Sequence, residues 1–150
     1  MAFTNSNDHL TGRKPAVYPA GAEVVAVRSA IDLVAADLDA NDVGAVAILP
    51  AGCVPVGVVY DSDDLDTNAS PTIAASVGFV NAGETDLDGT AWATGITTSQ
   101  AGGALSLTLT PAVMRMAATQ TDRKVGIKFT AAAATKAAGQ VGLTLLYRAV

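Results

Sequence analysis

The chain has 150 residues, of which 50% are hydrophobic and 15% are charged, and its formal net charge is −5. This length fits a single domain, and the high apolar content excludes a chain that is disordered throughout. The nine Lys and Arg residues are scattered, which excludes a generalised nucleic-acid binder, and no apolar run reaches the roughly 18 residues that cross a membrane.

The apolar half of the chain is made mostly of small side chains. Alanine contributes 30 residues and valine 17, whereas Phe, Trp and Tyr together contribute seven. Small side chains bury less area each, at roughly 25 cal/mol per Å², so a monomer with this composition has a thin core. Burial against other subunits would supply the apolar contact area that the monomer lacks. The composition therefore indicates an assembly protein, expected as a homo-oligomer (dimer or trimer).

Residues 1–20 are polar at first and are then punctuated by proline. Pro15 and Pro19 each fix φ and bias the preceding residue towards extended geometry. This predicts an extended N-terminal arm over residues 1–20 and a body over residues 21–150. A frayed terminus is the alternative, but apolar anchors favour an arm that docks on a neighbouring protein. The expected contact residues are Phe3, Leu10, Arg13, Lys14, Val17 and Tyr18.

Short strands follow one another along the body, separated by turn residues. They are expected at residues 22–33, 43–49, 53–61, 71–83, 104–111, 123–133 and 141–150. Pro55 removes one ladder donor, which places its end of the strand at a sheet edge or a bulge. The alternating patterns predict these core faces: Val25, Val27 and Ile31; Val46 and Ile48; Val56 and Val58; Leu105, Leu107 and Leu109; Ile127 and Phe129; Leu143 and Leu145.

The segments between the strands carry turn chemistry. Residues 34–42 fit a short helical turn or a loop, and residues 112–120 fit a helical turn or a short strand. Residues 85–103 are loop-rich, with Trp92 and Ile96 as packing anchors. The alanine-rich segment at residues 131–139 is too short to nucleate a helix and is expected to be a hairpin loop.

The pattern as a whole predicts an all-β protein with seven or eight short strands. No long amphipathic helix lies between the strands, so a parallel α/β sheet is excluded. The expected architecture is an antiparallel β-sandwich or jelly roll with an extended N-terminal arm.

One segment, "DSDDLDTNAS", gathers four carboxylates that are weak candidates for a metal site: Asp61, Asp63, Asp64 and Asp66. Hard cations such as calcium take six to eight oxygen ligands, and the alternation resembles the start of an EF-hand loop. Ala69 and Ala75 occupy the positions of the required glycine and bidentate glutamate, so the pattern fails. Aspartate favours turns, and we expect a solvated turn and no metal.

The chain lacks the residues of the common catalytic sites. Cys53 and His9 are the only residues of their kinds, and His9 lies in the polar arm, so no nucleophile with a base is expected. Cys53 is expected to be a buried small side chain. We expect no enzyme, no catalytic residue and no cofactor.

Three segments together resemble the small decoration (cement) and head structural proteins of tailed bacteriophages. They are "RKPAVYPAGAEVVAVRSAIDL", "DVGAVAILPAGCVPVGVVYDSDDLD" and "DRKVGIKFTAAAATKAAGQVGLTLLYRAV". The resemblance implies a β-sandwich or jelly-roll body with an arm, on the capsid surface of a virion, bridging subunits of the major capsid protein. It implies no catalysis and no cofactor. The alternative is a carbohydrate- or receptor-binding β-module of a phage tail or head fibre, but such modules present exposed aromatic platforms, and Trp92 is the one tryptophan.

Overall fold

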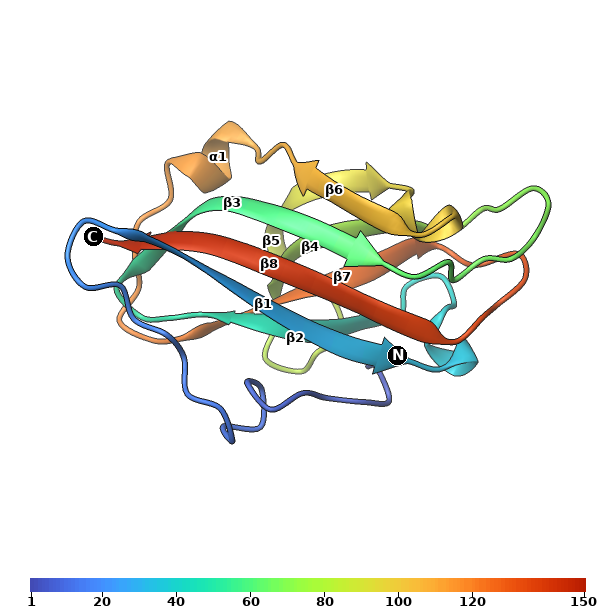
Figure 1. The fold of residues 1–150 in the computed structure, drawn as a ribbon, viewed down its shortest axis with the longest axis horizontal. Coiled ribbons are helices and arrows are strands. Elements are labelled where there is room, and N and C mark those ends of the chain that lie inside the picture. The colour runs from blue at the N-terminus through green and yellow to red at the C-terminus, as the bar shows by residue number, and fades with distance from the viewer.

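The computed structural model describes residues 1–150 as two four-stranded antiparallel sheets packed face to face (Figure 1). The first sheet has the order β1 (Val24–Leu33), β8 (Gly139–Ala149), β3 (Cys53–Ser62) and β6 (Gly103–Leu107). The second has the order β2 (Val43–Leu49), β7 (Arg123–Ala131), β4 (Ala74–Val80) and β5 (Leu87–Ile96). The connections contain three short helical turns, η1 (Ala35–Asp37), η2 (Thr98–Gln100) and α1 (Pro111–Met114).

This strand order is that of the eight-stranded jelly roll, in which two interlocked Greek keys form the two sheets. The prediction of an antiparallel β-sandwich is therefore confirmed, and the jelly roll is the form it takes. No helix in the structure is both long enough and apolar enough to cross a membrane.

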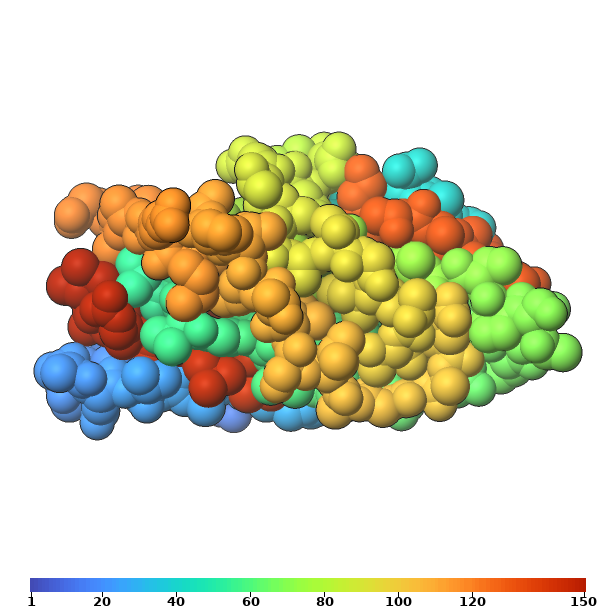
Figure 2. Space-filling model, turned by 90° about the horizontal axis from the view of Figure 1, so that it is seen from above, coloured from blue at the N-terminus to red at the C-terminus, as the bar shows by residue number.

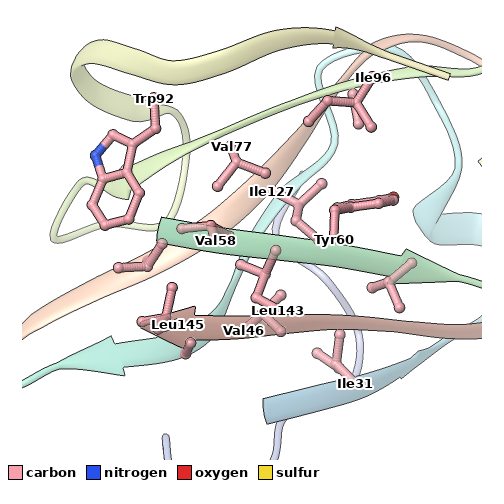
Figure 3. Packing of buried hydrophobic residues seen from close by; sticks show 14 of the residues in the cluster. Ile31, Val46, Val58, Tyr60, Val77, Trp92, Ile96, Ile127, Leu143 and Leu145 are labelled. Carbon is pink, nitrogen blue, oxygen red and sulfur yellow. The ribbon is translucent and has the colours of Figure 1, made fainter. Parts of the chain in front are cut away.

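The core between the sheets is one cluster of 24 buried residues (Figure 3). The predicted inward faces of β1, β7 and β8 are confirmed: Ile31, Ile127, Phe129, Leu143 and Leu145 are almost completely buried. Val25 and Val27 of β1 are partly buried and pack against the same core. Cys53 is buried as expected.

Two β-bulges make the predicted faces of β2 and β3 wrong in part. In β2 the register shifts between Ala45 and Ala47, so Val46 stays in the core but Ile48 is only half-buried. In β3 it shifts between Pro55 and Gly57, and Val56 at the bulge is exposed. An inserted residue reverses the alternation beyond it, which the apolar pattern does not reveal. Of the sheet edge or bulge expected beside Pro55, the structure shows the bulge.

The β5–β6 region also departs from the prediction. Residues 87–96, expected to be loop, form β5, although Trp92 and Ile96 are buried as predicted. β6 is an edge strand, and Leu105, predicted to be buried, is 47% exposed. Leu107 and Leu109 are partly buried against the core. Leu105 lies opposite the buried Tyr60 and so points to the inner face, but β5 does not cover it.

The alanine-rich segment after β7 is not a hairpin loop. β7 and β8 belong to different sheets, so the segment crosses from one sheet to the other. An isolated bridge between Asp66 and Lys136 joins it to the segment that follows β3.

The N-terminal arm runs along one side of the sandwich, beside the edge strands β1 and β2 (Figure 1). Ala2 forms a parallel bridge with Val43 of β2. The Asn7 amide donates to the carbonyl oxygen of Ala30 in β1 at 3.1 Å and to that of Val46 in β2 at 2.7 Å. The arm thus ties the two edge strands together and closes this side.

Candidate functional site

The first half of the arm packs against the chain's own body. The Phe3 ring lies against the core, with its centroid 5.8 Å from that of Phe129. Gly44 makes room for it, because a Cβ there would run into the ring. Leu10 packs on a small cluster formed by Val43, Ala45 and Val80. Phe3 and Leu10 are therefore held within this chain.

The second half of the arm presents its side chains to solvent. Arg13 and Lys14 are exposed, and Arg13 has only a distant ion pair with Asp8, at 3.9 Å. The exposed fractions of Val17 and Tyr18 are 45% and 58%. These four predicted contact residues are free to meet another molecule.

The backbone of this half is nonetheless anchored. The buried Tyr147 donates its hydroxyl hydrogen to the Val17 carbonyl oxygen at 2.5 Å. The Tyr18 hydroxyl donates to Asp122 at 3.4 Å, and the negative charge of Asp122 raises the pKa of Tyr18. Asp122 also accepts from the Ala51 N–H at 2.8 Å. The exposed side chains thus stand on a fixed backbone.

Most of the large apolar side chains exposed on the molecule lie on segments that meet at one end of the sandwich, where β1 begins and β8 ends (Figure 1). Val24 pairs with Arg148, which pairs in turn with Val54 of β3, two residues before the exposed Val56. We call this surface the apolar end; its members are Val17, Tyr18, Val24, Val56 and Val150. Clusters of exposed apolar side chains mark sites of protein interaction.

The carboxylates of the acidic segment do not converge on one site. Asp61 lies within β3 and binds Arg28 through both carboxylate oxygens, at 2.5 and 3.1 Å. Asp63 accepts from the Gln140 N–H at 2.8 Å, and Asp64 accepts from the Asp66 N–H at 3.1 Å. No group of three or more His, Cys, Asp or Glu residues in the molecule is placed to hold a metal ion.

Asp66 corrects the expectation of a solvated turn, because it is 1% exposed. Its carboxylate accepts backbone hydrogen bonds from Thr72, Ile73, Ala134 and Thr135, at 2.7 to 3.2 Å. Burial opposes ionisation, but these four bonds outweigh it and hold the pKa of Asp66 well below its usual range. Asp66 therefore fastens the segment after β3 to the crossing between β7 and β8.

The other chemically notable residues lie apart from any catalytic arrangement. Burial raises the pKa of the Cys53 thiol, which works against a reactive thiolate. Trp92 is completely buried, so the one tryptophan offers no platform for a sugar ring. The sequence placed Val56 on a buried face, which the bulge in β3 overturns, and it left Val24 off the predicted core face of its strand without assigning it to a contact surface.

The jelly roll is a common fold of viral capsid proteins. No family model matches the chain, and no curated protein matches it either. Among solved structures, a chain in the capsid of Ralstonia phage GP4 is 30% identical with a TM-score of 0.78, and the match covers 97% of each chain. A chain in the capsid asymmetric unit of cyanophage Pam1 is 27% identical with a TM-score of 0.63, over 98% of each chain.

A third match shows the fold alone. The chain in the acidic stable capsid structure of Helicobacter pylori bacteriophage KHP30 is 16% identical with a TM-score of 0.52, over 83% of this chain and 90% of that one. On the GP4 match, the chain belongs to a family of phage capsid-associated proteins, and its place is in the capsid of the virion.

Proposed function

We propose that this protein is a capsid cement or decoration protein, which stabilises the shell by bridging neighbouring subunits of the major capsid protein. The observation that carries the proposal is the apolar end, where exposed valines and Tyr18 stand on anchored backbone. A rigid apolar surface loses little conformational entropy on docking, and so more of its burial contributes to affinity.

The same surface explains the roles proposed for the second half of the arm. Val17 and Tyr18 pack in grooves of the neighbouring subunits, and Arg13 and Lys14 pair with acidic groups beside them. Phe3 and Leu10 contribute indirectly, because they hold the arm in place on its own body. Each contact is modest, and many copies acting on one shell resist internal pressure together.

The mechanism that we propose is binding, with no chemical step and no cofactor. The arm of residues 1–20 and the body of residues 21–150 act as one rigid attachment unit, and the protein associates as a dimer or trimer on the shell. Association between copies buries surface that the thin, alanine-rich chain leaves exposed.

The test is attachment to capsids that lack the protein. Particles are incubated with purified protein and pelleted, and occupancy is quantified across a concentration series. Cryo-electron microscopy then locates the density, and heating measures the temperature at which the shell ruptures. We expect saturable binding to the shell and a higher rupture temperature; density confined to the tail, or binding without added shell stability, contradicts the cement role.

Two matched variants locate the attachment surface. Val24 and Val34 are both exposed valines; Val24 is the first residue of β1, and Val34 directly follows its last residue. Val24→Gln should weaken attachment by about 1 kcal/mol or more, roughly fivefold, because it places a polar group in the contact. Val34→Gln should leave attachment unchanged, and equal losses in both variants would show that the apolar end is not the contact.

A further inference from the structure

The edge strands on the two long sides of this jelly roll differ in whether another segment packs along them. On the β1–β2 side the chain's own residues 1–7 cover both edge strands, with the Phe3 ring as a plug and the Asn7 amide as a bridge. On the opposite side the edge strands are β5 and β6, and no further strand of the chain pairs with either of them. Figure 2 looks onto this open side, formed largely by the yellow-to-orange part of the chain.

A groove of about 400 Å³ lies between β5 and β6. Its lining includes Trp92 and Ile96 of β5 and Leu105 and Leu107 of β6, and none of its lining side chains is charged. Leu105 points into this space and is 47% exposed. In a chain with a net charge of −5, an uncharged, partly apolar groove selects an uncharged, apolar occupant.

Hydrogen-bonding groups along the groove also lack partners. β6 pairs only with β3, so the backbone groups along its other edge are unpaired within the sheet. At one end of the groove the Thr110 N–H reaches the Trp92 carbonyl, but the buried Thr110 hydroxyl and Trp92 indole N–H have no partner within the chain. Figure 3 shows the indole nitrogen turned away from the other core side chains.

We propose that an extended, uncharged segment of a neighbouring capsid protein docks in this groove and adds a strand to β6. The segment places a large apolar side chain over Leu105 and Ile96. This side chain packs against the core in the same way as the Phe3 ring does on the β1–β2 side. Strand addition to an exposed sheet edge gives affinity through the main chain and specificity through alternate side chains. A second copy of this chain is a poorer occupant, because its own extended residues 1–7 are already bound to its β1–β2 side.

This inference rests on the proposed attachment to capsids, and hydrogen exchange followed by mass spectrometry tests it separately. Exchange is measured on the free protein and on the protein bound to particles that lacked it. We expect the amides of residues 103–108 to exchange roughly fivefold more slowly, or slower still, on the particle, because new backbone hydrogen bonds form there. Attachment with unchanged exchange in β6 overturns the inference but leaves the cement role standing; absence of attachment overturns both.

Two charge-matched variants complete the test. Leu105 faces the groove, whereas its neighbour Ala104 lies opposite Asp61 on the outer face of the same strand, and both are exposed. Leu105→Lys should reduce occupancy at least fivefold and abolish the slowed exchange, whereas Ala104→Lys should do neither. If β6 is already protected in a free oligomer, as sedimentation would reveal, the occupant is a second copy and the proposal is wrong.

Discussion

At the scale of single residues, Asp66 accepts more backbone hydrogen bonds than any other carboxylate in the acidic segment. Four backbone N–H groups from two separate segments depend on it. Asp66→Ala leaves these four N–H donors, one of them buried and three partly buried, without an acceptor. It should lower the free energy of unfolding by about 3 kcal/mol or more. Asp64→Ala is the matched control, because the exposed Asp64 accepts one bond, and urea titration should find it within about 1 kcal/mol of the wild type.

The lowered pKa of Asp66 predicts how stability depends on pH. An aspartate in the unfolded chain has a pKa of about 3.9, and the pKa of Asp66 in the folded protein lies well below that value. Its contribution is therefore complete above the unfolded value and is lost as the pH falls towards the folded one. The difference in unfolding free energy between wild type and Asp66→Asn should narrow below about pH 4, and a constant difference down to pH 2 would contradict this assignment.

At the scale of elements, the N-terminal arm stabilises the body through the Phe3 ring. Phe3→Ala removes the ring that packs beside Gly44 of β2 and Phe129 of β7, and should lower the free energy of unfolding by about 2 kcal/mol, since the ring is only partly buried. Gly44→Ala should have a similar effect, because the added methyl displaces the same ring.

The two variants form a cycle that tests the contact. If both act by expelling Phe3, the double variant should cost little more than either change alone, because both remove one interaction. Additive losses in thermal melts would mean that Gly44 is required for another reason. The strand pattern begins only at Ala22 and by itself predicts a body that folds without the arm. The contacts of Phe3 predict instead that deletion of residues 1–20 destabilises the body.

The strands show where the alternation of apolar residues predicts the buried face correctly and where it does not. It predicts the buried positions of Ile31, Ile127, Phe129, Leu143 and Leu145 correctly, because no extra residue is inserted between the compared positions of each strand. It fails at Ile48 and Val56, because an extra residue within β2 and within β3 shifts the register and reverses the faces. It fails at Leu105 because the extent of the opposite sheet decides whether an inward residue is covered. β5 was not predicted, because Gly89 and Gly95 in the sequence indicate turns; in the structure both glycines lie within the strand with positive φ.

The candidate site was also predictable only in part, because some of its residues are brought together by strand register and by contacts between distant segments. Val17 and Tyr18 stand out in sequence because apolar residues beside Pro15 and Pro19 are unexpected in a free tail. Val24 and Val56 join them only through strand register, and Asp66 is buried by a segment 68 and 69 residues further along the chain. Contacts between segments so distant leave no periodic signal.

At the scale of the whole molecule, the main core is one continuous cluster of 24 residues that draws on both sheets, and the second buried cluster has only three residues. A single core predicts a single cooperative unfolding transition. Trp92 lies in that cluster and is the one tryptophan, so denaturation curves from its fluorescence and from far-ultraviolet circular dichroism should coincide. A fluorescence change at lower denaturant concentration would instead show that the β5–β6 side opens first.

The Asp66 anchor also makes the loop beside it a place to carry foreign peptide. Asp66 and the backbone of Thr72 and Ile73 are fixed to each other, so the loop between them is closed whatever it contains. Ala69 lies at its exposed tip. Lengthening a closed loop costs only about 0.6 kcal/mol for each doubling, so an epitope inserted at Ala69 should be displayed with little loss of melting temperature.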